Sequence, residues 1–529
     1  IGSIDNTTPT PNAELNTLST LDIVNGGAGV DTLSINVTGG ATVNLPNMTN
    51  VEIVNVESTA GATVDTSAVA GVTNLNVTKV GVAGAVKATG ATTTDVNVSM
   101  KAAGAQVEAL GGKDVTVKLT DVAGSNVNKI AVGDVVATGS VNAPKGNVVV
   151  EATAKAADTV GANIVMGDIA VTGGKTISVT QKAGANNLVA DGPANGSGTT
   201  TTHTMGAVKV TANGDTTAVT LKQDAAATAE NIKAVTKVDE VATVTFTKLD
   251  SGQSATVSGL TFTASKDLTA EQVAKAFANL SASAIKPTQI APADTATGDT
   301  NGGDARADGV FTGALLAKWS SAAASGNTVT FTASGAMGTD LAASGTGATA
   351  VTNTQGVDAV TGKNTLGVAN GVVAITGGAA LKTVTVDGYA TSAAKGTNGI
   401  IGTTNTVLDT INLANGTGFV IESAAATLAL DLKNVNGTVD VDAGTKTLNV
   451  SVSHAKATDT ATLAANEATS VKVTGTGNVA GTTGAGANQL DAATSIDTTG
   501  MTAGNATFTI ANGTVTSYTG GAGKDAVTV

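Results

Sequence analysis

The sequence feature that most constrains the fold is an alternating apolar and polar pattern that recurs through most of the chain. It is clearest over residues 43–77, VNLPNMTNVEIVNVESTAGATVDTSAVAGVTNLNV. Variants of its ending return further along as TTDVNVS, GGKDVTVKL, ALKTVTVDG and TKTLNVSVS. Alternation with a period of two places Val, Ile and Leu on one face of a strand and polar residues on the other. The pattern predicts an all-β chain built from a repeated strand unit.

The spacing of these segments predicts an elongated repeat architecture. Successive strand centres are often separated by about 20 residues, a period that is typical of repeat proteins rather than of a single globule. A β-solenoid and a row of tandem β-sandwiches both satisfy this spacing. Only 2% of the 529 residues are aromatic, so Val, Ala, Leu, Ile and Thr methyl groups have to fill the core. Such side chains suit a thin core, which favours the solenoid and leaves the sandwich open.

The centre of the chain has a different pattern, which predicts an inserted module. Most of the aromatic residues fall in this part, together with the strand segments VATVTFT, LTFTA and VTFTAS. A helix is expected near residues 269–281, because Thr269 and Gln272 have capping-box spacing and apolar residues follow at i, i+3, i+4 and i+7. We therefore expect a strand-repeat region over residues 1–235, an α+β module over 236–350 and a second strand-repeat region over 351–529.

Charge and composition narrow the possible partners. The formal net charge is −13 and the sequence pI is near 4.6, so the chain lacks the basic face that nucleic-acid binding requires. An acidic balance favours solubility, calcium and cationic partners. The chain has no cysteine, which is common among bacterial surface proteins, and no run of about 20 apolar residues that would predict a transmembrane segment.

Two segments match the glycine-aspartate nonapeptide G-G-x-G-x-D-x-U. The first, GGAGVDTL, begins at Gly26 and the second, GGAGKDAV, begins at Gly520. In such a turn the glycines permit tight backbone geometry, while carbonyl and carboxylate groups supply the hard oxygen ligands that Ca²⁺ prefers. The predicted metal-site residues of these two turns are Gly26, Gly29, Asp31, Gly520, Gly523 and Asp525. The competing interpretation is an ordinary Gly-Asp turn.

With these turns and the GVTNLNVT-like strands, the chain resembles the RTX-type, type I-secreted surface-layer and β-strand-repeat proteins of Gram-negative bacteria. The resemblance implies export to the cell surface, Ca²⁺-dependent folding or assembly, and a paracrystalline coat. The partners it implies are further copies of the chain and a cell-envelope glycan such as lipopolysaccharide. In that family the calcium sites are built from tandem nonapeptides, whereas each match in this chain stands alone.

A second acidic segment lies between the predicted helix and Phe311. Its candidate metal ligands are Asp299, Asp304 and Asp308, with Asp294 and Asn301 nearby. The spacing does not fit an EF-hand, and Arg306 lies among the carboxylates, so a solvated insertion is the favoured interpretation. Asp440 and Asp442, two apart on a predicted strand, face the same side, where a solvated strand face is again favoured over a shared cation.

Nothing in the sequence predicts an enzyme. His203 and His454 lie in Thr-rich and Ser/Lys-rich surroundings and are expected to be isolated and exposed, and the chain has neither a cysteine nor a G-x-S-x-G segment. The first hypothesis is a structural subunit of a bacterial surface layer, secreted and self-assembling into a calcium-stabilised lattice. The alternative is an RTX-like adhesin or biofilm-matrix fibre, and the third class is a hydrolase with an RTX tail.

Overall fold

The computed structural model describes residues 2–5, 18–81, 84–103, 106–123, 129–133, 142–158, 161–187, 201–224, 235–281, 306–334, 340–359, 366–390, 399–402, 405–442, 444–483, 489–511 and 515–529. The chain divides into two compact units. The first comprises residues 1–188, 199–229 and 365–529, and the second comprises residues 189–198 and 230–364. The first unit is a β-solenoid and the second is an antiparallel β-sandwich.

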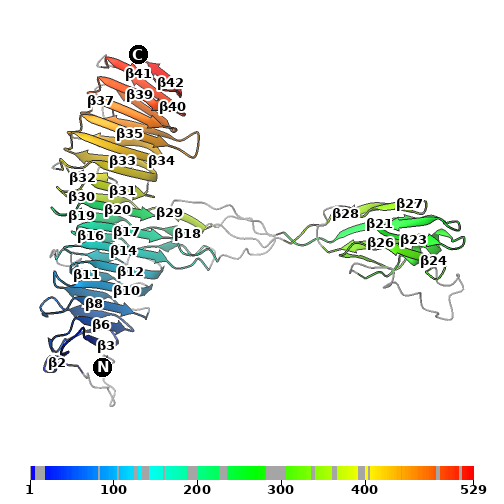
Figure 1. Ribbon diagram of the computed structural model, residues 1–529, viewed down its shortest axis with the longest axis horizontal. Helices are drawn as coiled ribbons and strands as arrows, with labels where there is room; N and C mark the ends of the chain where they lie inside the picture. Colours follow the sequence, from blue (N-terminus) through cyan, green and yellow to red (C-terminus); the bar gives the residue numbers. More distant parts are fainter. Residues whose placement is uncertain are drawn as a thin grey trace. The chain divides into compact units, whose positions relative to one another are not determined.

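The solenoid consists mainly of two parallel sheets joined into one 29-stranded hydrogen-bonded network (Figure 1). The strands of the first sheet are β1 (Gly2–Asp5), β3 (Thr32–Thr38), β6 (Ile53–Ser58), β8 (Asn74–Lys79), β10 (Asp95–Ala103), β12 (Val115–Ala123), β14 (Asn147–Ala154), β17 (Thr176–Lys182), β20 (Ala218–Gln223), β31 (Thr383–Asp387), β33 (Thr410–Ser423), β34 (Thr427–Asp442), β35 (Thr447–Ser453), β37 (Ser470–Gly475), β39 (Ser495–Met501) and β41 (Ser517–Thr519).

The second sheet alternates with the first along the chain. Its strands are β4 (Ala41–Thr42), β7 (Ala62–Asp65), β9 (Val86–Gly90), β11 (Val107–Gly111), β13 (Ile130–Val132), β16 (Ile169–Thr172), β19 (Val208–Ala212), β30 (Val373–Gly377), β32 (Gly399–Gly402), β36 (Thr460–Ala465), β38 (Asn478–Thr483), β40 (Asn505–Ile510) and β42 (Lys524–Thr528). The long strands β33 and β34 run through a corner and pair in both sheets. A short parallel pair, β2 (Ile23–Asn25) with β5 (Asn47–Thr49), lies near the N-terminal end of the chain.

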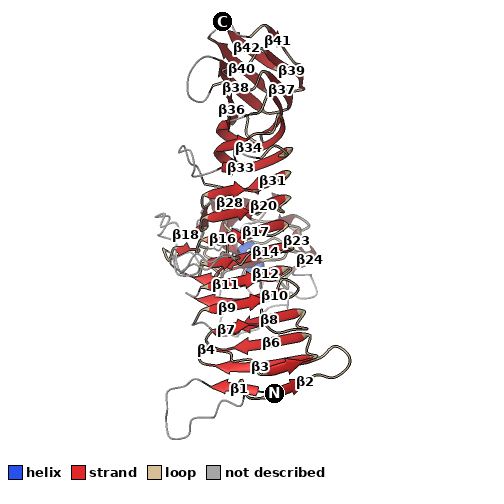
Figure 2. Cartoon of the chain, turned by 90° about the vertical axis from the view of Figure 1, so that its left-hand side faces the viewer, coloured by secondary structure: helices blue, strands red, loops and turns tan. Residues whose placement is uncertain are grey.

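Each coil contributes one strand to each sheet, so equivalent residues of successive coils stack (Figure 2). Asn55, Asn76 and Asn97 lie 21 residues apart in sequence. Asn76 Nδ2 donates to Asn55 Oδ1 at 2.8 Å, and Asn97 Nδ2 donates to Asn76 Oδ1 at 3.0 Å. These parallel ladders confirm the predicted solenoid. They exclude the alternative of tandem sandwiches for the described strand-repeat regions, because the sandwiches would require antiparallel pairing.

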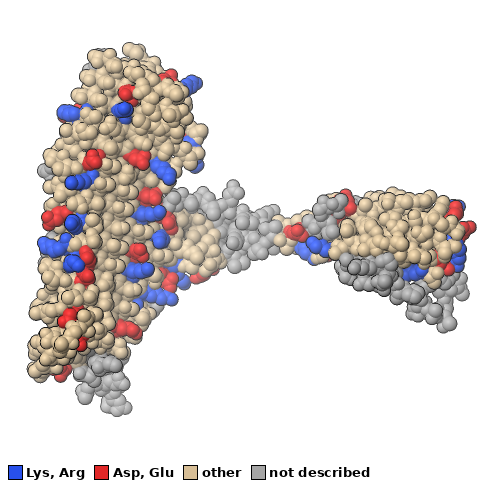
Figure 3. All heavy atoms as spheres, in the orientation of Figure 1, with Lys and Arg blue, Asp and Glu red and all other residues tan. Residues whose placement is uncertain are grey.

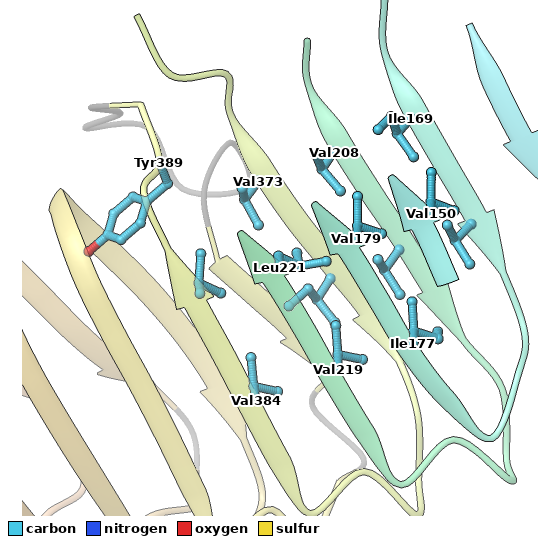
Figure 4. Packing of buried hydrophobic residues seen from close by; sticks show 14 of the residues in the cluster. Val150, Ile169, Ile177, Val179, Val208, Val219, Leu221, Val373, Val384 and Tyr389 are labelled. Atoms are coloured by element: carbon cyan, nitrogen blue, oxygen red, sulfur yellow. The ribbon is translucent and has the colours of Figure 1, made fainter. Parts of the chain in front are cut away.

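The solenoid core is a thin layer of small apolar side chains stacked in columns. Val54, Leu75 and Val96 belong to one column of the first sheet, and all three are fully buried. Figure 4 shows the two sheets contributing to the same layer, with Ile177 and Val219 from the first and Ile169 and Val208 from the second. This packing follows from the alternation in the sequence, because every second residue of each strand faces the interior.

The outward faces are polar, with positive and negative side chains interspersed (Figure 3). Ion pairs join neighbouring coils, as between Lys118 and Glu151 at 3.5 Å and between Lys222 and Asp387 at 3.5 Å. In both pairs the lysine side chain is exposed to solvent, so each ion pair contributes about 1 kcal/mol or less to the free energy of unfolding. The apolar core therefore supplies most of the stability of the stack.

The two predicted strand-repeat regions form one continuous solenoid. Strand β20 pairs in parallel with β31, although residues 230–364 of the second unit lie between Val219 and Val384 in the sequence. A third short parallel sheet accompanies the coils around this insertion, with strands β15 (Ile164–Val165), β18 (Thr201–Thr204) and β29 (Leu366–Ala369). The second unit thus interrupts a single coil without interrupting the sheets.

The second unit is a β-sandwich with its own aromatic core. One sheet has the order β25 (Trp319–Ser321), β26 (Thr328–Ala333), β21 (Glu240–Phe246) and β28 (Ala348–Thr354). The other has the order β24 (Gly309–Gly313), β23 (Leu260–Ala264), β22 (Ser254–Val257) and β27 (Ala343–Gly345). Phe246, Phe262, Phe277 and Phe331 pack together between the sheets and are fully buried. The unit is therefore more β-rich than the expected α+β module.

The expected helix is present as α1 (Ala270–Ala276), and its cap is the predicted one. Gln272 N–H donates to the Thr269 hydroxyl at 3.3 Å, and Thr269 N–H donates to Gln272 Oε1 at 2.8 Å. This reciprocal pair satisfies two N–H groups that would otherwise lack partners at the helix start. No helix among the described residues is long and apolar enough to cross a membrane.

Candidate calcium-binding turns

The N-terminal Gly-Asp turn joins β2 to β3 and depends on glycine at three positions. Gly27 and Gly29 have φ values of 92° and 120°, in the region that only glycine adopts without strain. At Gly26, a Cβ atom would collide with the carbonyl oxygen of Asn50 and lie 2.6 Å from Asp31 Cβ. The glycines therefore let the Asp31 side chain fold back over the start of the turn.

Oxygen atoms from two successive coils meet at this turn. The Asp31 N–H donates to Glu52 Oε2 at 2.8 Å, which places the two acidic residues side by side although they lie 21 residues apart in sequence. Asp31 Oδ2 is buried and has no hydrogen-bond partner among the described residues. Asn25 Oδ1 lies beside them and accepts from Gly27 N–H and Asn50 Nδ2, each at 3.1 Å.

This arrangement fits a turn that binds a hard cation better than an ordinary Gly-Asp turn without a ligand. Two neighbouring carboxylates repel each other, and a buried carboxylate oxygen without a donor is costly unless a proton or a cation satisfies it. Ca²⁺ accepts carboxylate, amide and backbone carbonyl oxygens in flexible geometry. Asp31 and Glu52 are thus the side chains that could hold it, with the carbonyl of Asn50 close by.

The C-terminal turn shares the sequence but not the arrangement. Asp525 again folds over the first glycine, since a Cβ at Gly520 would lie 2.5 Å from its Oδ2. Its Oδ1, however, accepts from the Tyr518 hydroxyl at 2.9 Å and the Thr498 hydroxyl at 3.4 Å. Gly521 and Gly523, the counterparts of Gly27 and Gly29, do not adopt the left-handed φ seen at those two positions. Asp525 therefore has protein donors where Asp31 has an unsatisfied oxygen.

Among the described residues, the other predicted acidic positions form no metal cluster. Asp299 and Asp304 lie outside the described residues. The Asp308 carboxylate pairs with Lys266 Nζ at 2.9 Å, while Arg306 donates from Nε to the carbonyl of Ala276 at the end of α1 at 3.0 Å. The cation that pairs with Asp308 is thus Lys266 and not Arg306. On β34, Asp442 Oδ1 accepts from Asn466 at 2.9 Å.

No group of three or more His, Asp and Glu side chains with metal-binding geometry is found among the described residues. The N-terminal turn consequently offers two carboxylates and relies on carbonyl and amide oxygens for further ligands. The sequence analysis named Asp31 as a candidate ligand and did not name Glu52. The signal for Glu52 was its position one coil after Asp31, which becomes visible only once the 21-residue coil is recognised.

Both histidines are less exposed than expected, because His203 is buried and His454 is half-buried. His203, expected to be exposed, is fully buried on β18. Its Nδ1 accepts from Gly184 N–H at 3.1 Å, and burial lowers its pKa below the ordinary value. The Nε2 atom of His454 lies 3.0 Å from the carbonyl oxygen of Asn478. The error for His203 arises because the TTTTHT segment forms a third sheet against the core, which the alternation alone did not indicate.

No known family model matches this chain. A search of curated proteins also finds no match.

Proposed function

We propose that this protein is a structural subunit of a bacterial surface layer, self-assembling into a two-dimensional lattice in which Ca²⁺ stabilises folding and subunit contacts. The observation that carries the proposal is the N-terminal Gly-Asp turn, where Asp31 and Glu52 from adjacent coils lie together and one buried carboxylate oxygen lacks a partner. The net charge of −13 supports it, because divalent cations relieve repulsion between acidic subunits.

The solenoid supports a structural role independently of the metal. Its polar side chains are regularly spaced, because equivalent positions repeat from coil to coil as in the Asn55, Asn76 and Asn97 ladder. A repeated surface lets many weak contacts add when copies associate side by side. The expected location is the bacterial cell surface, with further copies of the chain and a cell-envelope glycan such as lipopolysaccharide as partners.

Calcium-dependent association of the purified chain tests the role of the turn. We expect light scattering to increase with millimolar Ca²⁺, the range of extracellular calcium modules, and to reverse with EGTA. Asp31→Asn and Glu52→Gln should each raise the Ca²⁺ concentration at half-maximal scattering, because each removes a negative ligand. Asp215→Asn, at an exposed turn residue of the same unit, is the matched control and should leave it unchanged. Equal calcium dependence in all four proteins would contradict the proposed site.

The alternative is an adhesin or matrix fibre in which the solenoid is a spacer and the sandwich carries the binding surface. One observation favours it: the sandwich is a separate compact unit with its own core, inserted within one coil. Deleting residues 230–364, so that the two parts of the solenoid are joined directly, should then abolish adhesion to cells and leave association of the solenoid intact. Loss of lattice formation with adhesion unchanged would favour the surface layer instead.

A further inference from the structure

A cavity of about 570 Å³ opens at one corner of the solenoid, and four successive coils line it. We call it the corner cavity. Tyr389 follows β31, Asn415 and Asn434 lie in the middle of β33 and β34, and Lys456 and Asp459 lie between β35 and β36. Its volume falls within the range of about 300–1,000 Å³ that is typical of small-molecule sites.

An amide ladder forms the wall of the corner cavity. Asn415 and Asn434 both have φ of 53°, a left-handed conformation that asparagine tolerates better than most residues. Asn415 Nδ2 donates to Asp387 Oδ1 at 2.7 Å, and Asn434 Nδ2 donates to Asn415 Oδ1 at 3.1 Å. Ala455 N–H then donates to Asn434 Oδ1 at 2.7 Å. The ladder fixes the amide groups in place before any ligand arrives.

The Tyr389 hydroxyl is an unsatisfied donor on the same wall. The side chain is 3% exposed, and its hydroxyl is buried without a hydrogen-bond partner among the described residues. The ring is held edge-on against Phe419, with centroids 5.3 Å apart, and covers Gly416, where any Cβ would collide with it. Burial raises the pKa of Tyr389 above its ordinary value, so the phenol remains a neutral donor.

The rim adds charged and polar groups that the protein leaves available. Lys456 and Asp459 line the same cavity, yet neither side chain forms an ion pair within the described part of the chain. Asn436 Oδ1 accepts from Gly437 N–H at 2.9 Å and Thr460 N–H at 3.4 Å, which leaves its Nδ2 group for a ligand. The opening therefore offers both donors and an acceptor.

We propose that the corner cavity binds a saccharide. Each hydroxyl of a sugar both donates and accepts, which matches a wall that offers a phenol, an ammonium group and an amide as donors beside a carboxylate as acceptor. A phosphate ligand is disfavoured, because the single Lys456 is accompanied by Asp459. A metal ion is disfavoured, because only one carboxylate lines the cavity. Saccharide binding here is independent of the calcium turns and of lattice assembly.

The test measures binding of sugars to the full chain in its unassembled form. Isothermal titration and saturation-transfer NMR would use a panel of free neutral, amino and acidic mono- and disaccharides, together with the zwitterionic amino acids glycine and lysine. A second arm would use polysaccharides immobilised on an array, with free sugars as competitors. Competition by a free sugar places recognition at a single unit, whereas polysaccharide binding without competition indicates recognition of a longer segment.

We expect at least one saccharide to bind, and Asp459→Ala and Lys456→Ala each to weaken its affinity by about tenfold or more. Ala455→Trp should abolish binding by filling the opening, and its exposed position keeps the core unchanged, which circular dichroism would verify. Lys209→Ala and Asp215→Ala, on exposed parts of other coils, are the matched controls and should bind as the wild type does.

Three results would overturn the proposal. One is the absence of binding in both arms for the folded wild-type chain. Another is saccharide binding that Ala455→Trp leaves intact, which would place the sugar elsewhere. The third is binding of a zwitterionic amino acid in preference to every saccharide, which would assign Lys456 and Asp459 to ammonium and carboxylate recognition.

Discussion

The solenoid and the sandwich use the same Thr and Val alternation but pair their strands in opposite ways. In the solenoid, chain direction repeats and each strand meets its parallel equivalent in the next coil. In the sandwich, β22 and β23 form a hairpin in which Val257 pairs with Leu260 across Ser258 and Gly259. Both turn residues have positive φ, 43° and 89°, as the tight hairpin turn requires. Turn chemistry, rather than strand alternation, decides between the two architectures.

The hydrophobic cores of the solenoid and the sandwich are filled by different kinds of side chain. The two solenoid sheets enclose a thin layer that Val, Ala, Leu and Ile fill. Aromatic rings fill much of the sandwich core, with Phe246 and Phe277 stacked at 5.0 Å and the tilted rings of Phe262 and Phe311 4.8 Å apart. Large aromatic side chains concentrate stability in few residues, whereas a column of small residues distributes it over many coils. Single substitutions should therefore act differently in the two units.

Removing the Phe277 ring from the sandwich core should have the largest effect on stability. Phe277→Ala removes a fully buried aromatic side chain, and we expect it to lower the free energy of unfolding of the sandwich by about 3–5 kcal/mol. Trp319 is the only tryptophan and is buried in this core, so its fluorescence reports on the sandwich alone. Denaturant titration followed by tryptophan fluorescence should move to lower concentration, while the circular dichroism transition of the solenoid stays in place. A joint shift of both transitions would show that the units do not unfold independently.

Truncating a buried side chain of the solenoid should cost a comparable free energy, but only the neighbouring coils should be destabilised. Leu75→Ala on β8 is expected to cost about 2–5 kcal/mol. Because each coil contacts mainly its neighbours, hydrogen exchange should accelerate in β6, β8 and β10 and remain slow in distant strands such as β37. The tryptophan transition should not move. Uniform loss of protection along the solenoid would contradict this distributed core.

Lowering the pH should destabilise the folded solenoid through protonation of His203. The pKa of this histidine is lowered in the folded state, so the unfolded chain binds the proton more readily. Its contribution to stability is present above the unfolded pKa of about 6.5 and is lost as pH falls from there toward the folded value. Solenoid unfolding at pH 8 and pH 5, followed by circular dichroism, should show a smaller pH dependence in His203→Gln than in the wild type. His454→Gln is the control, and an equal reduction in both variants would exclude His203 as the source.

The smallest expected effect is at the helix cap of the sandwich. Thr269→Ala removes the hydroxyl that accepts from Gln272 N–H and should destabilise the sandwich by about 1 kcal/mol in the tryptophan-monitored titration. Thr269→Ser retains the hydroxyl and should remain close to the wild type. If the two variants behave alike, the capping box contributes little to this unit.

The periodic parts of this fold were predictable from sequence, and the contacts between coils were not. Alternation identified the strands, and the Thr269 and Gln272 spacing identified α1. The residues facing one another in adjacent coils depend on coil length, which varies from 18 residues between Thr460 and Asn478 to 42 between Gln181 and Gln223, apart from the coil that carries the second unit. This variation concealed the partnership of Glu52 with Asp31. It also concealed the corner cavity, whose lining residues meet only after four coils are stacked.

The central claim is that calcium organises this chain into a surface lattice, and electron microscopy of the purified protein tests it most directly. Samples would be prepared with millimolar Ca²⁺ and, in parallel, with EGTA. The proposal predicts sheets or tubes with a regular two-dimensional lattice that dissolve on chelation. Isolated rods or one-dimensional fibres in both conditions would contradict the lattice and favour the adhesin or matrix fibre.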